Sequence, residues 1–301
     1  MPLVLAIFGP TASGKSDVAE ALAERIPAEL VSADAMQVYR GLPLLTNQSP
    51  TPAHLVGIWE LGHESSVGEY QRLAHESIDE ILGRDRTPVV VGGTGLYLRA
   101  ALGRLELPPA PDPGRREHWE RVYDRLGAER AHELLTDHDP DSAARVHAND
   151  RRRVVRALEL AEAGLSLRPE RDRLWSEEMR HPTLVFGLDL PKDVLERRIE
   201  ERTRRMFELG VEDEVRTALR GPISATARHI HGLREVAELP PDEALRALVV
   251  RTRRYAAYQR KWMRRMPGLA SVRADRPPGE TADEILEMAR ARERLPAGRG
   301  R

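Results

Sequence analysis

The octapeptide Gly9-Pro10-Thr11-Ala12-Ser13-Gly14-Lys15-Ser16 has the residue types and the spacing of a phosphate-binding loop. It matches the pattern G-x-x-x-x-G-K-[ST], in which two glycines let the backbone turn so that successive N–H groups face one ligand. Lys15 adds a positive charge for the phosphate oxygens, and the Ser16 hydroxyl is suited to bind Mg²⁺. The loop predicts a site for a phosphate or diphosphate, and taken alone it favours ATP, because most such loops hold ATP.

Two further polar residues follow predicted strands. Asp34 comes after the short apolar stretch Glu29–Ser32, and Thr94 lies in a glycine-rich turn after Pro88–Val91. Ligands bind at the carboxyl ends of strands in open α/β sheets, so Asp34 is a candidate base or magnesium-associated group, and Thr94 a candidate substrate contact. The alternatives remain open: Asp34 can simply cap a turn, and Thr94 can be a helix N-cap.

Thiol chemistry and a histidine-bound metal have little support in the sequence. The chain contains no cysteine, which excludes disulfides, thiolate metal sites and cysteine nucleophiles. His229 and His231 are two residues apart, but no third ligand has a suitable spacing, so they do not predict a metal site.

The elements that must position these residues indicate an α/β fold. An apolar strand over residues 3–8 precedes the phosphate loop, and a helix from Lys15 to Arg25 follows it, which disfavours a chance glycine turn. We predict a phosphate-loop parallel sheet flanked by helices, with strands also at Val56–Leu61 and from Thr183. The sheet would be built from residues 1–113 and 183–275, with an all-helical insertion over 114–182 and a peripheral tail over 276–301.

Charge is locally concentrated in two predicted helices. The 301 residues carry 32% charged side chains but a net charge of only -1, so affinity for a polyanion requires local clusters. The first helix, 149–159, contains Arg152, Arg153 and Arg156. The second, 242–265, has seven Lys or Arg residues and no acid from Arg251 onward, with an apolar stripe of Tyr255, Tyr258, Trp262 and Met266. Basic faces of this kind suit a polyanion, although each can also be an ordinary solvated face.

No stretch of 18 apolar residues occurs, and the N-terminus has no signal-type pattern. We therefore expect a cytoplasmic protein without a membrane partner, acting as a monomer.

The order of the motifs GPTASGKS, SADAMQVY, VVVGGTGLY, NDRRRVVRALE and TRRYAAYQRKW resembles the tRNA dimethylallyltransferase family over roughly residues 3–270. The resemblance implies a phosphate-loop α/β enzyme that transfers a dimethylallyl group from dimethylallyl diphosphate to N6 of the adenosine just 3′ of the anticodon in tRNA. It further implies a Mg²⁺ cofactor, and the anticodon stem-loop as partner.

The resemblance also assigns site residues. Gly9 to Ser16 would hold the diphosphate, assisted by Arg202 and Arg253, with Ser16 on the metal. Lys15, Ser16, Asp34 and Thr94 would form the catalytic set, in which Asp34 takes or orients the N6 proton. The tRNA contacts would come from Asp34, Ala35, Met36, Gln37, Thr94, Arg116, Arg152, Arg153 and Arg156.

The chain departs from the family pattern at several positions. Ala35 replaces a serine, Ala257-Tyr258 replaces a Lys-Arg pair, and His231 stands where an apolar residue is usual. Leu45-Thr46-Asn47-Gln48 replaces a Gly-Thr-Ala-Lys type run. These changes affect individual contacts more than the reaction.

Three other functions are compatible with part of the sequence. A small-molecule kinase shares the phosphate loop, and an isopentenyltransferase acting on free AMP shares the donor chemistry, but neither requires the arginine clusters. A nucleotide-dependent RNA-binding switch would tolerate the loss of Asp34.

Overall fold

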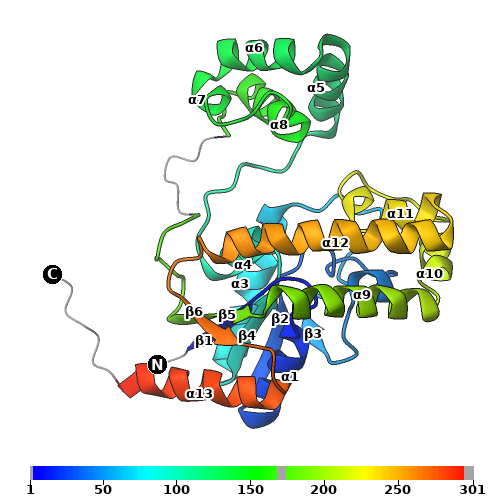
Figure 1. Cartoon of the computed structure of the whole chain (residues 1–301). Helices are drawn as coiled ribbons and strands as arrows, with labels where there is room; N and C mark the ends of the chain where they lie inside the picture. The colour runs from blue at the N-terminus through cyan, green and yellow to red at the C-terminus, as the bar shows by residue number, and fades with distance from the viewer. Residues whose placement is uncertain (1–2, 168–173, 295–301) are drawn as a thin grey trace. The chain divides into compact units, whose positions relative to one another are not determined.

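A six-stranded parallel sheet forms the centre of the computed structural model, which describes residues 3–167 and 174–294. The strand order is β3-β2-β4-β1-β5-β6 (Figure 1). The strands are β1 (Val4–Phe8), β2 (Ala28–Ser32), β3 (Ala53–His54), β4 (Thr87–Gly92), β5 (Thr183–Asp189) and β6 (Leu269–Arg273). Because β1 pairs with β4 on one side and β5 on the other, the phosphate loop leaves the middle of the sheet.

Helices connect and cover these strands. In the sheet-containing part they are α1 (Lys15–Arg25), α2 (Pro43–Thr46), α3 (Val67–Gly83), α4 (Gly95–Leu102), α9 (Lys192–Glu208), α10 (Val211–Ala218), the 3₁₀ helix η1 (Ala227–His229), α11 (Leu233–Glu238), α12 (Pro241–Met263) and α13 (Pro278–Arg294). Between β4 and β5 lie α5 (Pro113–Leu126), α6 (Ala128–His138), α7 (Pro140–Ala143) and α8 (Arg151–Glu162).

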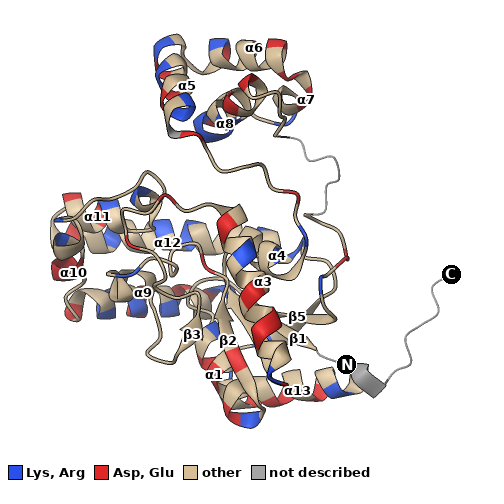
Figure 2. Cartoon of the chain, turned by 180° about the vertical axis from the view of Figure 1, so that it is seen from behind, with Lys and Arg blue, Asp and Glu red and all other residues tan. Residues whose placement is uncertain are grey.

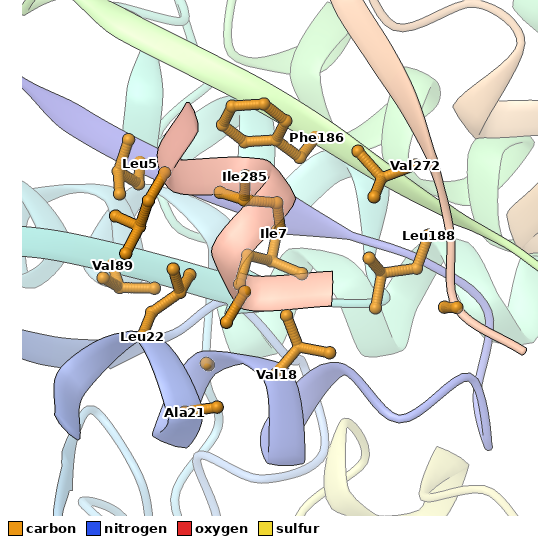
Figure 3. Packing of buried hydrophobic residues seen from close by; sticks show 14 of the residues in the cluster. Leu5, Ile7, Val18, Ala21, Leu22, Val89, Phe186, Leu188, Val272 and Ile285 are labelled. Atoms are coloured by element: carbon orange, nitrogen blue, oxygen red, sulfur yellow. The ribbon is translucent and has the colours of Figure 1, made fainter. Parts of the chain in front are cut away.

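The main core lies between the sheet and the pair α1 and α13. Leu5 and Ile7 alternate along β1 toward this side and pack against Leu22 of α1 and Ile285 of α13, all buried (Figure 3). Helices α3 and α4 pack together and against β4. Both faces of the sheet are covered, which explains why β1 is apolar at every position.

The chain divides into two compact units, residues 1–103 with 177–301 and residues 104–176. The smaller unit begins and ends earlier in the chain than the insertion that we predicted over residues 114–182. The smaller unit has its own core, in which Val154, Val155 and Leu158 of α8 pack with Leu135 of α6.

Two local predictions were wrong, and one strand was missed. The segment 276–301 is not peripheral in its described part, because Ala282 and Ile285 of α13 are fully buried against α1; residues 295–301 lie outside the described part. No strand spans Val56–Leu61: β3 lies earlier, and Trp59 makes only an isolated bridge with Tyr39. Strand β6 was not predicted.

Among the described residues, no helix is long and apolar enough to cross a membrane.

Candidate active site

One cavity of about 500 Å³ lies at the carboxyl end of the sheet. The phosphate loop, the segment after β2, and helices α9 and α12 all contribute to its wall. The lining side chains and backbone belong to Thr11, Ala12, Ser13, Gly14, Lys15, Ser16, Asp17, Val18, Asp34, Met36, Gln37, Leu45, Thr46, Asn47, Val91, Gly92, Arg198, Arg202, His231, Tyr255, Gln259, Ala274, Arg276 and Pro278. The structure therefore brings most of the predicted loop residues together with Asp34 and Arg202.

The phosphate loop has the backbone that its glycines predict. Gly14 caps α1 with φ of 87°, a conformation that disfavours residues with a Cβ atom. Ala12 also has a positive φ, 63°, although it is not a glycine. Strained backbone of this kind is typical of ligand-binding loops, where the surrounding structure imposes it.

Two arginines of α9 contact the phosphate loop. Arg198 and Arg202 are one helical turn apart and line the cavity together. The Arg202 Nη2 atom donates to Thr11 Oγ1 at 2.6 Å, while its buried Nε has no hydrogen-bond partner within residues 3–167 and 174–294. Arg198 Nη1 lies 3.4 Å from the Ser13 carbonyl oxygen. Arg198 was not predicted, although the spacing of four from Arg202 in a helix is a signal for it.

The cavity holds more positive than negative charge. Burial lowers the pKa of the Lys15 ammonium to about 8; the nearby Asp34 opposes this shift and Arg202 reinforces it. Burial likewise lowers the pKa of Arg202 to about 10, again opposed by Asp34. Lys15 Nζ donates to the Pro10 carbonyl at 2.8 Å. Buried cations with unused donors are costly without an anion, so the cavity is suited to a strongly negative ligand.

Asp34 and Thr94 lie on adjacent loops, as their positions after β2 and β4 predict. Asp34 Oδ1 accepts from the Met36 N–H at 2.9 Å, so it caps a turn and also lines the cavity. Thr94 is the N-cap residue of α4, but its side chain does not bond its own helix. Instead Oγ1 accepts from the Ala35 N–H at 3.3 Å and lies 3.5 Å from the Tyr255 hydroxyl.

Helix α12 supplies site residues that we did not predict. Tyr255 and Gln259 line the cavity, and the His231 ring stacks on Tyr255 with the ring centres 5.2 Å apart. Burial, and to a lesser extent Arg251, lower the pKa of His231 to about 4, so the imidazole is neutral at pH 7. Tyr255 was read only as part of an apolar stripe; its spacing of four from Gln259 would have placed both on one helical face.

The oxygen atoms at the loop are suitable for Mg²⁺. Ser16 and Asp34 both line the cavity, and the Ser16 hydroxyl has no hydrogen-bond partner among the described residues. In that part of the chain no three His, Cys, Asp or Glu residues cluster as a metal site. Mg²⁺ is commonly bound through one or two protein oxygens together with substrate phosphates, so this sparse set fits Mg²⁺.

Arg253 does not line the cavity, in contrast to Arg202. Its Nη2 lies 3.4 Å from Glu200 Oε2 on α9, an ion pair between α12 and α9. The structure therefore gives Arg253 an acidic partner outside the cavity, and it does not join the predicted diphosphate-binding set.

The predicted RNA-binding arginines of the smaller unit differ in their surroundings. Arg152 and Arg153 are exposed on α8 and have no ion pair among the described residues. Arg156 is only 16% exposed; it pairs with the buried Glu159 at 2.7 Å and donates to the Pro109 carbonyl. Arg116 pairs with Glu120 one turn on, at 3.3 Å. Arg156 thus stabilises the unit internally and does not share the exposed face of Arg152.

Basic residues recur along α9 and α12 (Figure 2). Three basic residues of α12 have acidic partners on neighbouring elements: Arg251 with Glu235, Arg253 with Glu200, and Arg260 with Asp189. Arg254, Lys261 and Arg264 are exposed without ion pairs in the described part of the chain. The predicted apolar stripe is interrupted, because Tyr258 is 55% exposed.

A parallel sheet with a glycine-rich phosphate loop at its centre, and a cation-lined cavity around that loop, places the chain among α/β proteins with a phosphate-loop-like fold. Family models described as IPP transferase and isopentenyl transferase match residues 37–266 and 2–59. The chain belongs to the IPP transferase family.

Individual relatives agree with this membership. The chain is 39% identical over 279 residues to a tRNA dimethylallyltransferase from Streptomyces coelicolor, covering 88% of each. The crystal structure of a full-length tRNA isopentenylpyrophosphate transferase from Bacillus halodurans matches with a TM-score of 0.69 and 31% identity, covering 96% of both chains. A eukaryotic dimethylallyltransferase, crystallised acting on tRNA, shares the fold at a TM-score of 0.77 and 22% identity, over 100% of this chain and 82% of the other.

Proposed function

We propose that this protein transfers a dimethylallyl group from dimethylallyl diphosphate to N6 of the adenosine just 3′ of the anticodon in tRNA, releasing diphosphate. The observation that carries the proposal is the cavity that the phosphate loop with its Lys15 lines together with Arg198 and Arg202 of α9 and the carboxylate of Asp34. Family membership supplies the class of reaction, and the Streptomyces coelicolor relative named above is a tRNA dimethylallyltransferase.

The loop and α9 would hold the diphosphate as a leaving group. The bond between the allylic carbon and the diphosphate oxygen breaks with its electron pair on the oxygen, so negative charge grows there in the transition state. Lys15, Arg202 and the loop N–H groups would stabilise this charge, and they are already oriented around the cavity. Mg²⁺, held by Ser16 and through Asp34, would add positive charge to the diphosphate.

Asp34 would act on the nucleophile. The exocyclic amine of adenine is a weak nucleophile, and it must lose one proton when the new nitrogen–carbon bond forms. The Asp34 carboxylate keeps an acceptor oxygen besides the one that bonds the Met36 N–H, so it can orient the amine and accept that proton. Thr94, which bonds the residue after Asp34, holds this loop in place.

The adenosine must leave its stack in the anticodon loop to reach such a cavity. Exposed cations without acidic partners are the side chains available to bind backbone phosphates while this happens. In the smaller unit these are Arg152 and Arg153, and on α12 they include Arg254 and Lys261. Arg116 and Arg156, which have internal ion pairs, are weaker candidates.

The test is to incubate the protein with Mg²⁺, dimethylallyl diphosphate and undermodified tRNA, and to measure by mass spectrometry whether adenosine gains one C5H8 unit. Transfer to tRNA, with none to free AMP, is expected. Transfer to AMP instead would indicate a nucleotide isopentenyltransferase, and ATP turnover without any prenyl transfer would indicate a kinase.

The Asp34→Asn variant tests the role of the carboxylate. We expect kcat to fall by at least about 100-fold, the range of general base catalysis, with little change in affinity for dimethylallyl diphosphate. Asp242→Asn, an exposed aspartate at the start of α12, is the matched control and should keep full activity. Equal activity of the two variants would exclude Asp34 as the proton acceptor.

A further inference from the structure

Gln259 connects the two glycine-rich loops of the cavity through its side-chain amide. Its Oε1 atom accepts from the Thr11 N–H at 2.8 Å, and its Nε2 atom donates to the Gly93 carbonyl at 2.9 Å. The residue is only 2% exposed. Both functional atoms of the amide are therefore used, one on the loop after β1 and the other on the loop after β4.

The two loops serve different halves of the site. Thr11 belongs to the phosphate loop, and its hydroxyl accepts from Arg202. Gly93 directly precedes Thr94, whose hydroxyl bonds the backbone next to Asp34. A path of hydrogen bonds and backbone thus runs from Arg202 through Thr11, Gln259 and Gly93 to Thr94, and it joins the groups proposed to hold the diphosphate to those proposed to act on the amine.

The Gln259 amide packs directly against Gly93. A Cβ atom at Gly93 would lie 2.4 Å from Gln259 Nε2, too close for any side chain without moving the amide. The glycine is needed there because the amide occupies the space of a side chain. An amide is needed because neither a carboxylate nor an apolar side chain of similar length can both accept from Thr11 and donate to Gly93.

We propose that Gln259 is a positioning residue that fixes the spacing between the diphosphate-binding loop and the Asp34–Thr94 loop. This role rests on the transferase function proposed above. Only the transition state requires the allylic carbon of dimethylallyl diphosphate and the adenine amine to be at bonding distance at the same time. Each substrate can bind to its own loop separately. Loss of Gln259 should therefore lower kcat and leave both KM values nearly unchanged.

Gln259→Met and Gln259→Glu test this role. The methionine removes both hydrogen bonds at nearly the same volume. The glutamate keeps the acceptor for the Thr11 N–H, and at a pH above the pKa of its buried carboxyl it faces the Gly93 carbonyl without a proton to donate. We expect kcat to fall by about 10-fold to 100-fold in both variants, the effect of a misplacement of about 1 Å. The KM for each substrate, and the affinity for inorganic diphosphate measured by calorimetry, should stay within about threefold of wild type, a small effect on this scale.

A structural control separates positioning from loss of stability. Ile285→Val removes a methylene from the core between α13 and α1, away from the cavity, and should lower the melting temperature without changing kcat per folded molecule. All rates are normalised to the folded fraction, measured by circular dichroism. If one Gln259 variant fails to fold, the other carries the test.

The outcomes are distinct. A fall in kcat with unchanged KM supports the role. Gln259 variants with wild-type kcat, or with raised KM alone, refute it while leaving the transferase function intact. Failure of the wild-type protein to transfer the prenyl group refutes the proposed function and this role with it.

Discussion

Lys15 should make the binding of dimethylallyl diphosphate depend on pH in a range where ordinary lysines do not titrate. Burial lowers its pKa to about 8 in the free protein, whereas a bound diphosphate stabilises the charged form. If only the protonated form binds, the apparent Kd scales with one plus the ratio of neutral to charged lysine. Between pH 7 and pH 9 that factor rises about tenfold, or about 1.4 kcal/mol of binding free energy.

Other titratable groups in the cavity do not alter the expected change of Kd between pH 7 and pH 9. Arg202, with a pKa of about 10, stays mainly charged over the range, and His231, at about 4, stays neutral. The last phosphate proton of the ligand leaves at a pKa of about 6. Calorimetry with dimethylallyl diphosphate, in the absence of tRNA, should also detect the uptake of about half a proton at pH 8.

Lys15→Arg is the matched control for this experiment, because a guanidinium stays charged and should bind with a nearly constant Kd from pH 7 to pH 9. A wild-type Kd that is also constant would refute the reasoning, since it would show that Lys15 keeps its usual pKa near 10.5 despite its position in the cavity.

Three further predictions follow from the same contacts. Lys15→Met should raise the free energy of unfolding of the ligand-free protein by up to about 3 kcal/mol below pH 8. Because the pKa of Lys15 is lower in the folded state than in the unfolded state, the destabilisation by the lysine is fully present below pH 8 and disappears as the pH rises to 10.5. Urea unfolding curves without this pH trend would contradict the burial of the charge. Replacing Arg152 and Arg153 with alanine should raise the KM for tRNA. The negative slope of the logarithm of the tRNA-binding constant against the logarithm of salt concentration should become shallower by about 1.4 to 1.8. An unchanged slope would show that neither arginine contacts a tRNA phosphate. Arg156→Ala should instead destabilise the protein by about 3 kcal/mol, because it leaves the buried Glu159 unpaired, and a loss of tRNA affinity at unchanged stability would reverse this assignment.

Local signals were sufficient for the phosphate loop and its neighbours. The helix from Lys15 to Arg25 was predicted with its observed bounds, because the glycine-rich loop fixes its start and the apolar period fixes its length. The positions of Asp34 and Thr94 at one edge of the sheet followed from the parallel strand order. In each case the relevant residues are close in sequence or belong to adjoining strands.

Long-range partners could not be predicted in this way. The contact between Gln259 and Thr11 joins residues 248 positions apart, and no periodicity identifies such a pair. The acid that pairs with Arg253 likewise comes into contact only through packing between α9 and α12. Glu159 differs, because it lies three residues after Arg156 on the same helix and the helical spacing indicates that pair. Helix α13 was read as peripheral because small alanines, which pack closely against α1, contribute little to an apolar pattern.

The central position of β1 has a consequence for how the chain folds. Val4–Phe8 is made before both of its neighbours in the sheet: it pairs on one side with β4 and on the other with residues 183–187, and its core is completed only by α13. Pairings between such distant segments have a high loop-closure entropy, and they make folding slow. The unit 104–176 has its whole core in one continuous stretch and can fold during synthesis, before β5 exists. The phosphate loop, although made before β4 and β5, can be held in its native position only after β5 and α13 have been made.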